Sequence, residues 1–140
     1  MKEQEIKNIL RSKSLKATSA RLNLLTQMSE YKSAMPSSTI QRKLKSLDRV
    51  TLYRTIESLK EHGIIHKAYQ ENNESYYALC GSRCSHNHHN HDHIHFKCVK
   101  CDAVTCEKMG EEFEINLPKK QLYKLNVYAE GVCDNCVEVN

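Results

Sequence analysis

Two pairs of cysteines with the same short spacing are the clearest chemical feature of this 140-residue sequence. Cys98 and Cys101 flank Val-Lys, and Cys133 and Cys136 flank Asp-Asn. Each pair places two thiolates on one tight turn, and two such turns supply the four-sulfur tetrahedral environment that zinc prefers. Because four thiolates leave no open coordination position, we expect a structural zinc ion that contributes to folding and is not catalytic.

The alternative for these cysteines is a redox-active dithiol. The occurrence of two pairs, without a thioredoxin-like βαβ pattern around either, argues against it. The 31 residues between Cys101 and Cys133 exceed the separation found in a compact zinc ribbon. We therefore expect an α/β element to be folded inside this loop, with the zinc ion tying its last strand back to its first.

The remaining composition suggests a compartment and a partner. The sequence shows neither an apolar signal segment nor a membrane-length apolar stretch, so we expect a cytoplasmic protein with reduced thiols and no membrane partner. Residues 1–70 hold 14 Lys/Arg against 6 Asp/Glu, whereas residues 71–140 hold 7 against 11. The basic half suits a polyanionic partner, although charge alone favours a solvated surface.

The apolar spacing in the first half predicts helices. They are expected around Ile6–Leu10, from near Thr18, from Pro36, and from an N-cap at Asp48 to a C′ glycine at Gly63. Two strands, 64–69 and 75–79, are expected on either side of a turn at 71–74. Helices followed by such a hairpin predict a winged helix-turn-helix domain over residues 1–80.

The second half is expected to form a separate, small α/β domain. Residues 81–90 are almost devoid of apolar side chains and are interpreted as a hinge. Over residues 91–140 we expect strands at 93–97 and 122–128 and a short helix at 107–113. The predicted fold class is thus α+β, with the four-cysteine zinc site in the second domain.

A series of short motifs, in order and over about residues 10–136, resembles the ferric-uptake-regulator family, and its zinc-uptake-regulator branch most of all. The resemblance implies homodimeric transcription factors with a winged-helix domain, a C-terminal dimerisation domain, a structural zinc ion and a separate sensory metal. It also implies repression from AT-rich palindromic DNA when metal is bound, with no small-molecule substrate and no enzymatic activity. The motifs are Thr18-Ser-Ala-Arg21, Thr51-Leu-Tyr53-Arg54-Thr-Ile-x-x-Leu59, Gly63-Ile-Ile, Tyr77-Ala-Leu79, His93-Ile-His95-Phe-Lys-Cys98-Val-Lys-Cys101 and Gly131-Val-Cys133-Asp-Asn-Cys136.

The DNA contacts that the resemblance implies fall on two predicted helices. Thr51, Tyr53 and Arg54 lie in the first turns of the fourth helix, where a recognition helix meets base edges and phosphates. An Arg at this place can bind guanine or phosphate with its two-pronged guanidinium, and a Tyr ring can contact thymine methyl groups. The implied contacts to the DNA backbone or minor groove open the second helix, at Lys16, Thr18 and Arg21.

Three departures from the iron-sensing pattern bear on which metal is sensed. Ala78 stands where iron sensors of the family tend to have a carboxylate, Ile94 where many relatives have Asp, and Leu125 where some have His. The oxygen-rich ligand set of an iron or peroxide sensor is therefore largely missing. An iron, manganese, nickel or peroxide sensor on the same scaffold nevertheless stays an alternative.

The ligands that remain are soft. His66 and Cys80 occupy positions that resemble zinc-sensor ligands, and with His93 and His95 they would give one thiolate and three imidazoles for a second zinc ion. This set spans the hinge, so zinc occupancy would fix the orientation of the DNA-binding domain. Whether Cys84, His91 or Cys106 replaces one of these four residues stays open, as does the role of the histidine-rich tract at 86–91.

Two functions of other classes were weighed. The first is a zinc hydrolase or deaminase. The deaminase signature requires His-x-Glu and Pro-Cys-x-x-Cys, but here His95 stands at the Glu position after His93, Lys97 precedes Cys98, and no general-base Glu is placed beside a metal-bound water. A histidine-rich metal buffer without DNA binding would not need the recognition pattern that runs from Thr51 to Gly63. We therefore expect a regulator and not an enzyme.

Overall fold

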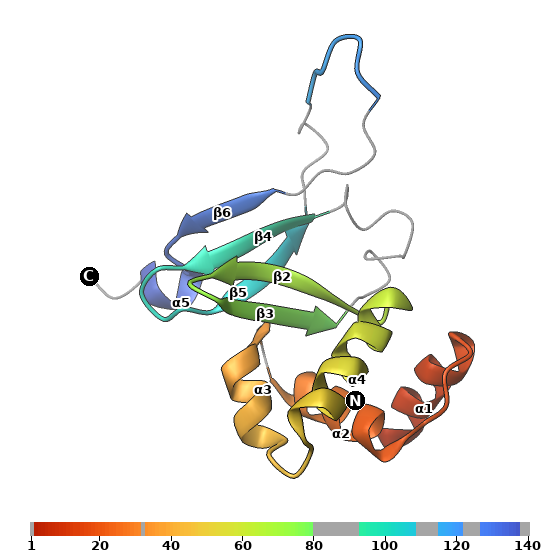
Figure 1. The fold of residues 1–140 in the computed structure, drawn as a ribbon. Helices are drawn as coiled ribbons and strands as arrows, with labels where there is room; N and C mark the ends of the chain where they lie inside the picture. Colours follow the sequence, from red (N-terminus) through yellow and green to blue (C-terminus); the bar gives the residue numbers. More distant parts are fainter. Residues whose placement is uncertain (1, 32, 80–92, 109–114, 122–126, 138–140) are drawn as a thin grey trace. The chain divides into compact units, whose positions relative to one another are not determined.

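The computed structural model describes residues 2–31, 33–79, 93–108, 115–121 and 127–137, and it contains both helices and sheets (Figure 1). The chain divides into two compact units, residues 1–80 and residues 81–140. Among the helices of the described ranges, none combines the length and the apolar character that a membrane crossing requires. The predicted hinge at 81–90 lies outside the described residues.

The first unit packs four helices against a small antiparallel sheet whose strand order is β1-β3-β2. Helical spacing lets each helix bury one apolar stripe, so that Ile6 and Leu10 of α1 and Leu24 and Leu25 of α2 meet in one core. The elements are α1 (Glu3–Ser12), α2 (Ser19–Glu30), β1 (Met35–Pro36), α3 (Ser37–Lys43), α4 (Arg49–Glu61), β2 (Ile65–Glu71) and β3 (Glu74–Leu79).

Helix α4 has well-defined ends, and both were expected from the sequence. The carboxylate Oδ1 of Asp48 accepts a hydrogen bond from the backbone N–H of Thr51 at 2.7 Å. At the other end Gly63 has φ of 70°, and the N–H groups of Gly63 and Ile64 bond to the carbonyls of Lys60 and Leu59. This is a Schellman cap, which requires the left-handed conformation that glycine adopts without strain.

The turn between β2 and β3 also follows from its residues. Asn72 and Asn73 both have positive φ, at 50° and 66°, which is the geometry of a type I′ two-residue hairpin turn. Because this turn is so tight, the strands extend through Glu71 and from Glu74, further than the sequence indicated. Strand β1 was not predicted; it is two residues long and pairs with Tyr76 and Tyr77.

Glu74 contributes a contact that links the hairpin to α3. Its Oε1 accepts hydrogen bonds from the backbone N–H of Ser38 at 2.8 Å and from the hydroxyl of Ser37 at 3.1 Å. Helix α3 has no side-chain cap from its own N-cap residue, Pro36. The first turn of α3 is therefore capped from a strand 36 residues away in sequence.

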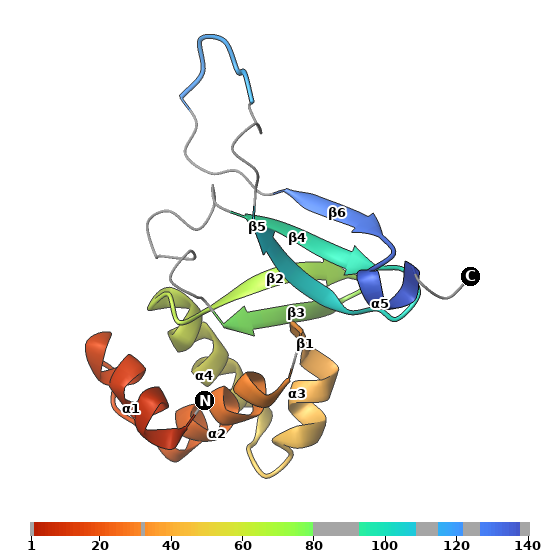
Figure 2. The same ribbon diagram turned by 180° about the vertical axis from the view of Figure 1, so that it is seen from behind.

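The second unit contains a three-stranded sheet in the order β5-β4-β6, with the predicted strand at 93–97 in its centre (Figures 1 and 2). Strand β5 is antiparallel to β4, whereas β6 is parallel to it. Its elements are β4 (His93–Cys98), β5 (Val104–Lys108), β6 (Tyr128–Gly131) and the short helix α5 (Asp134–Val137).

Two expectations for this unit need correction. The helix expected at 107–113 is wrong at its start, because Glu107 and Lys108 belong to β5; residues 109–113 lie outside the described residues. Pairing with β4 and burial of Val104 override the local helix propensity there. Of the strand expected at 122–128, Tyr128 belongs to β6, which runs on to Gly131, and residue 127 is not in a strand; residues 122–126 lie outside the described residues.

Candidate metal centre and nucleic-acid interface

The sheet of the second unit brings the two cysteine pairs together. Cys98 ends β4, and the chain returns through a tight turn in which the N–H of Asp102 bonds to the carbonyl of Cys98 at 2.9 Å. The positive φ of Asp102, 63°, allows this reversal. In the parallel β4–β6 register Cys98 lies beside Gly131, so Cys133 follows just two residues later.

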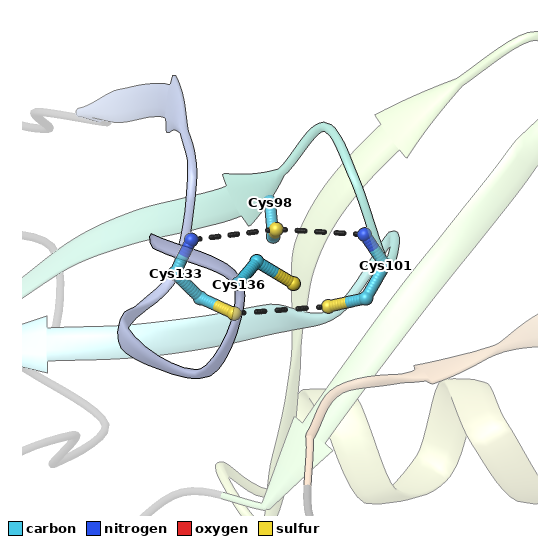
Figure 3. Close-up of side chains that lie close together, drawn as sticks. All are labelled: Cys98, Cys101, Cys133 and Cys136. Carbon is cyan, nitrogen blue, oxygen red and sulfur yellow. Dashed lines mark hydrogen bonds between the residues drawn. The ribbon is translucent and has the colours of Figure 1, made fainter. Parts of the chain in front are cut away.

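The four cysteines form a cluster with the dimensions of a tetrahedral metal site (Figure 3). All four Sγ atoms lie within 4.8 Å of one another, and those of Cys101 and Cys133 are 3.8 Å apart. A zinc ion bound at Zn–S distances of about 2.3 Å places its sulfurs about 3.8 Å from each other. The four-cysteine cluster, Cys98, Cys101, Cys133 and Cys136, can therefore hold a metal ion such as zinc.

Cys98 is the innermost member of the cluster, with no solvent-exposed surface. The backbone N–H groups of Cys101, at 3.5 Å, and of Cys133, at 3.4 Å, both point at its Sγ (Figure 3). These two donors lower the pKa of the Cys98 thiol from 9.0 to about 6. Each cysteine pair thus supplies one backbone N–H group, and both groups stabilise the Cys98 thiolate.

Two other thiols of the cluster, those of Cys136 and Cys101, show the opposite behaviour. The hydrogen bond with Cys133 raises the pKa of Cys136 to about 12. For Cys101, the N–H of Ala103 favours the thiolate, but contacts with Cys98 and with Cys133, together with burial, outweigh it and raise the pKa. Four sulfurs this close cannot all be ionised unless a cation compensates their charge, which is the property of a metal ligand set.

Gly131 lies close to the Phe96 ring beside this site. A Cβ atom at this position would lie 3.3 Å from the ring of Phe96, tighter than ordinary van der Waals contact. The small residue lets β6 lie close to β4 where the second cysteine pair begins. The sequence signal for it was only its place in the Gly-Val-Cys motif.

The structure places the four residues predicted to bind a sensory metal as follows. His66 lies on β2 of the first unit and His95 on β4 of the second, and both are buried. His93 begins β4. Cys80 lies outside the described residues, as do Cys84, His91 and the rest of the histidine-rich tract at 86–91.

Cys106 is the described competitor for that predicted site. It lies directly opposite His95 in the antiparallel register of β4 and β5. A ring nitrogen of His95 and the Sγ of Cys106 lie within 4.8 Å of each other, and the ring of Tyr128 packs 5.5 Å from the imidazole. A thiol and an imidazole are thus side by side within the second unit.

Helix α4 presents the predicted DNA-reading residues to solvent. Tyr53 is 65% exposed and Val50 57% exposed, and Arg54 beside them is exposed too. Thr51 is half-buried. The opposite face of the helix is anchored in the core by Leu52, Ile56 and Leu59.

The three residues predicted to contact the DNA backbone or minor groove lie at the start of α2. Lys16 and Thr18 are exposed, and the Thr18 hydroxyl caps the helix by accepting the N–H of Arg21 at 3.3 Å. The Arg21 guanidinium donates to the carbonyl of Lys16 at 2.9 Å and to the hydroxyl of Ser58 at 3.4 Å. Arg21 therefore ties this loop to α4, a role that the sequence did not indicate.

Comparison with known proteins places this arrangement in a family. A model described as the ferric uptake regulator family matches residues 12–128. A zinc uptake regulator solved with zinc and DNA has a TM-score of 0.66 and 23% identity, covering 99% of this chain and 97% of that one. Holo XcZur gives 0.66 and 18%, with coverage of 97% and 99%. The ferric uptake regulator from Pseudomonas aeruginosa with manganese gives 0.62 and 18%, with coverage of 92% and 98%.

No curated protein matches the chain. The solved structures, at these identities, support the shared fold. The family match spans most of the sequence and both units. The chain belongs to the ferric uptake regulator family, whose members are metal-responsive, DNA-binding transcription regulators and not enzymes.

Proposed function

We propose that this protein is a cytoplasmic, zinc-sensing transcriptional repressor that binds AT-rich palindromic operators as a zinc-loaded homodimer and controls metal-uptake genes. The observation that carries the proposal is the exposed Tyr53–Arg54 pair on a helix whose other face is locked into the core. Val50, Tyr53 and Arg54 are exposed on the same face of α4, and such a combination of apolar and cationic side chains suits thymine methyl groups and phosphates.

In this proposal the first unit is a winged helix-turn-helix domain. Helices α3 and α4 form the helix-turn-helix, and the β2–β3 hairpin forms the wing. Thr51, Tyr53 and Arg54 read the major groove, because they lie in the first turns of α4. The side chains of Tyr53 and Arg54 are exposed, whereas that of Thr51 is half-buried. Lys16 and Thr18 contact the DNA backbone, and Arg21 both holds their loop and adds positive charge.

The second unit carries a structural zinc ion and mediates dimerisation. Cys98, Cys101, Cys133 and Cys136 hold the ion, which closes the loop between β4 and α5. What supports zinc here is the all-sulfur ligand set and the 3.8 Å separation of two of its sulfurs. The ion stabilises the fold and leaves regulation to a second site.

The regulatory site is proposed to bind a second zinc ion through His66, Cys80, His93 and His95, with Cys106 as the alternative thiolate. The adjacency of His95 and Cys106 supports a soft site in this part of the sheet, and soft ligands favour zinc over manganese or ferrous iron. A solved structure of similar fold is described as a zinc uptake regulator complexed with zinc and DNA.

In the proposed mechanism, zinc binding and DNA binding are coupled. His66 belongs to the first unit and His95 to the second, so a zinc ion bound by both fixes the orientation of the recognition helices in a dimer. Only the fixed arrangement matches the spacing of two half-sites. Zinc and DNA then strengthen each other's binding by the same factor. When zinc is scarce the site empties and the regulated genes are released.

A pair of cysteine variants tests this function. Cys80→Ser should abolish zinc-dependent binding to an AT-rich palindromic duplex while the protein keeps its four-cysteine zinc and stays folded. Cys106→Ser is the matched control. If Cys106→Ser loses zinc-dependent DNA binding and Cys80→Ser keeps it, the regulatory thiolate is Cys106. The proposal is contradicted if Cys80→Ser and Cys106→Ser each bind the duplex at wild-type strength, equally with and without a zinc chelator.

A further inference from the structure

A strongly basic surface lies between α3 and α4, beside the predicted reading residues. Residues 37–56 contain five Lys or Arg and a single acidic residue, Asp48. All five basic side chains are exposed. They are Arg42, Lys43, Lys45, Arg49 and Arg54.

A hollow of about 250 Å³ opens in this surface. It is lined by Gln41, Lys45, Leu47, Arg49 and Leu52, so that two cationic side chains and an amide surround an apolar floor. The turn that shapes it is fixed by the hydrogen bond from the N–H of Leu47 to the carbonyl of Leu44 at 3.0 Å, and Leu44 is buried in the core. The hollow is thus preformed within the first unit.

The hollow adjoins the reading face of α4. A neighbouring depression shares Gln41, Arg49 and Leu52 with it and continues to Tyr53. An occupant of the hollow would therefore lie next to whatever Tyr53 touches. If Tyr53 touches a base edge, the nearest anionic group of the DNA is a backbone phosphate, which carries the opposite charge to Lys and Arg.

Asp48 explains why the side chains, and not the end of α4, select an anion here. Its carboxylate already accepts the N–H of Thr51, and this hydrogen bond lowers the pKa of Asp48, so the residue is ionised. The helix terminus is therefore occupied by a carboxylate. Lys45 and Arg49 must supply the attraction for a second anion.

We propose that Lys45 and Arg49, with the Gln41 amide as a further donor, clamp one DNA backbone phosphate in this hollow. The inference rests on the proposed DNA-binding function and adds an anchor that sets the register of α4 on the duplex. The Arg49 guanidinium can bind two phosphate oxygens at once, and Lys45 contributes a point charge. Such a contact strengthens binding to every sequence alike.

The test compares Lys45→Gln/Arg49→Gln with a charge-matched control, Lys119→Gln/Lys120→Gln, which removes two exposed lysines from the other unit. Binding of zinc-loaded protein to an AT-rich palindromic duplex and to a GC-rich duplex of equal length is measured over a series of salt concentrations. The clamp predicts loss by the same factor on both duplexes. It also predicts a plot of log K against log salt that is shallower by about two for the proposed dimer, since each protomer clamps one phosphate and each neutralised phosphate contributes about 0.9.

Arg49→Lys, which keeps the charge, should retain most of the salt slope, and all variants should keep the wild-type melting temperature because the altered side chains are exposed. The clamp is excluded if the double variant loses no more affinity than the control, or if its loss is confined to the AT-rich duplex. If wild-type protein binds neither duplex, the proposed function fails. If wild-type protein binds DNA and the double variant loses no more affinity than the control, the clamp fails and the proposed function stands.

Discussion

The Sγ atoms of Cys101 and Cys133 lie 3.8 Å apart, although the two residues are separated by 32 positions in sequence. Parallel pairing of β4 with β6 produces this proximity, because it aligns Cys98 with Gly131. A metal ion at this point therefore joins the carboxyl ends of β4 and β6. Its removal should affect the fold of the second unit before it affects any regulatory function.

Replacing one cluster cysteine should unfold the second unit. Cys101→Ser removes one of the four ligands, and structural zinc binding contributes roughly 10 kcal/mol or more to such small domains. We expect loss of the tightly held zinc ion and of the melting transition of this unit, measured by metal analysis and calorimetry. Cys106→Ser, outside the cluster on β5, should keep both. Retention of a full equivalent of tightly bound zinc by Cys101→Ser would contradict the assignment.

The exposed residues of α4 should matter for DNA and not for stability. Tyr53→Ala and Arg54→Ala change side chains that stand in solvent, so the melting temperature should be unchanged. Loss of a two-pronged contact from Arg54 should cost about 1–3 kcal/mol of binding free energy and relax sequence preference at one base pair. Fluorescence anisotropy with the palindromic duplex measures this, with Lys120→Ala as control. Wild-type affinity in both α4 variants would remove this helix from the interface.

The contact between the hairpin and α3 predicts a stability effect of its own. Glu74→Ala removes the carboxylate that caps Ser38, at a cost of about 1 kcal/mol in the free energy of unfolding. The Ser38 N–H lowers the pKa of Glu74, so this contribution is present at neutral pH and lost as acid protonates the carboxylate. Glu61→Ala, a change of an exposed glutamate in the same unit, is the comparison for denaturant unfolding. Equal stability of the two variants would show that the cap is not significant.

The sequence predicted the features that depend on local chemistry. The Asp48 cap, the Gly63 terminus and the paired Asn turn each follow from a few adjacent residues, and the cysteine spacing indicated the cluster. Features that depend on tertiary pairing were missed. The helix expected at 107–113 overlaps the end of β5, because Glu107 and Lys108 favour helices locally. No residue adjacent to Ser38 indicates that Glu74 caps it.

The same distinction applies to the site residues. Exposure of Tyr53 and Arg54 followed from the helical pattern, since the apolar positions of α4 define its buried face. The hydrogen bonds of Arg21 to Lys16 and Ser58 could not be foreseen, because Ser58 is distant in sequence. The pairing of Cys106 with His95 likewise requires the β4–β5 register.

A zinc titration of metal-depleted protein, in which bound zinc and affinity for an AT-rich palindromic duplex are measured on the same samples, tests most directly whether a second zinc ion controls DNA binding. We expect the first equivalent per chain to fill the four-cysteine cluster and restore the fold with weak DNA binding. Strong binding should appear only as a second equivalent is taken up. Full affinity after the first equivalent, with no change as more zinc binds, would show that a second zinc ion does not control DNA binding.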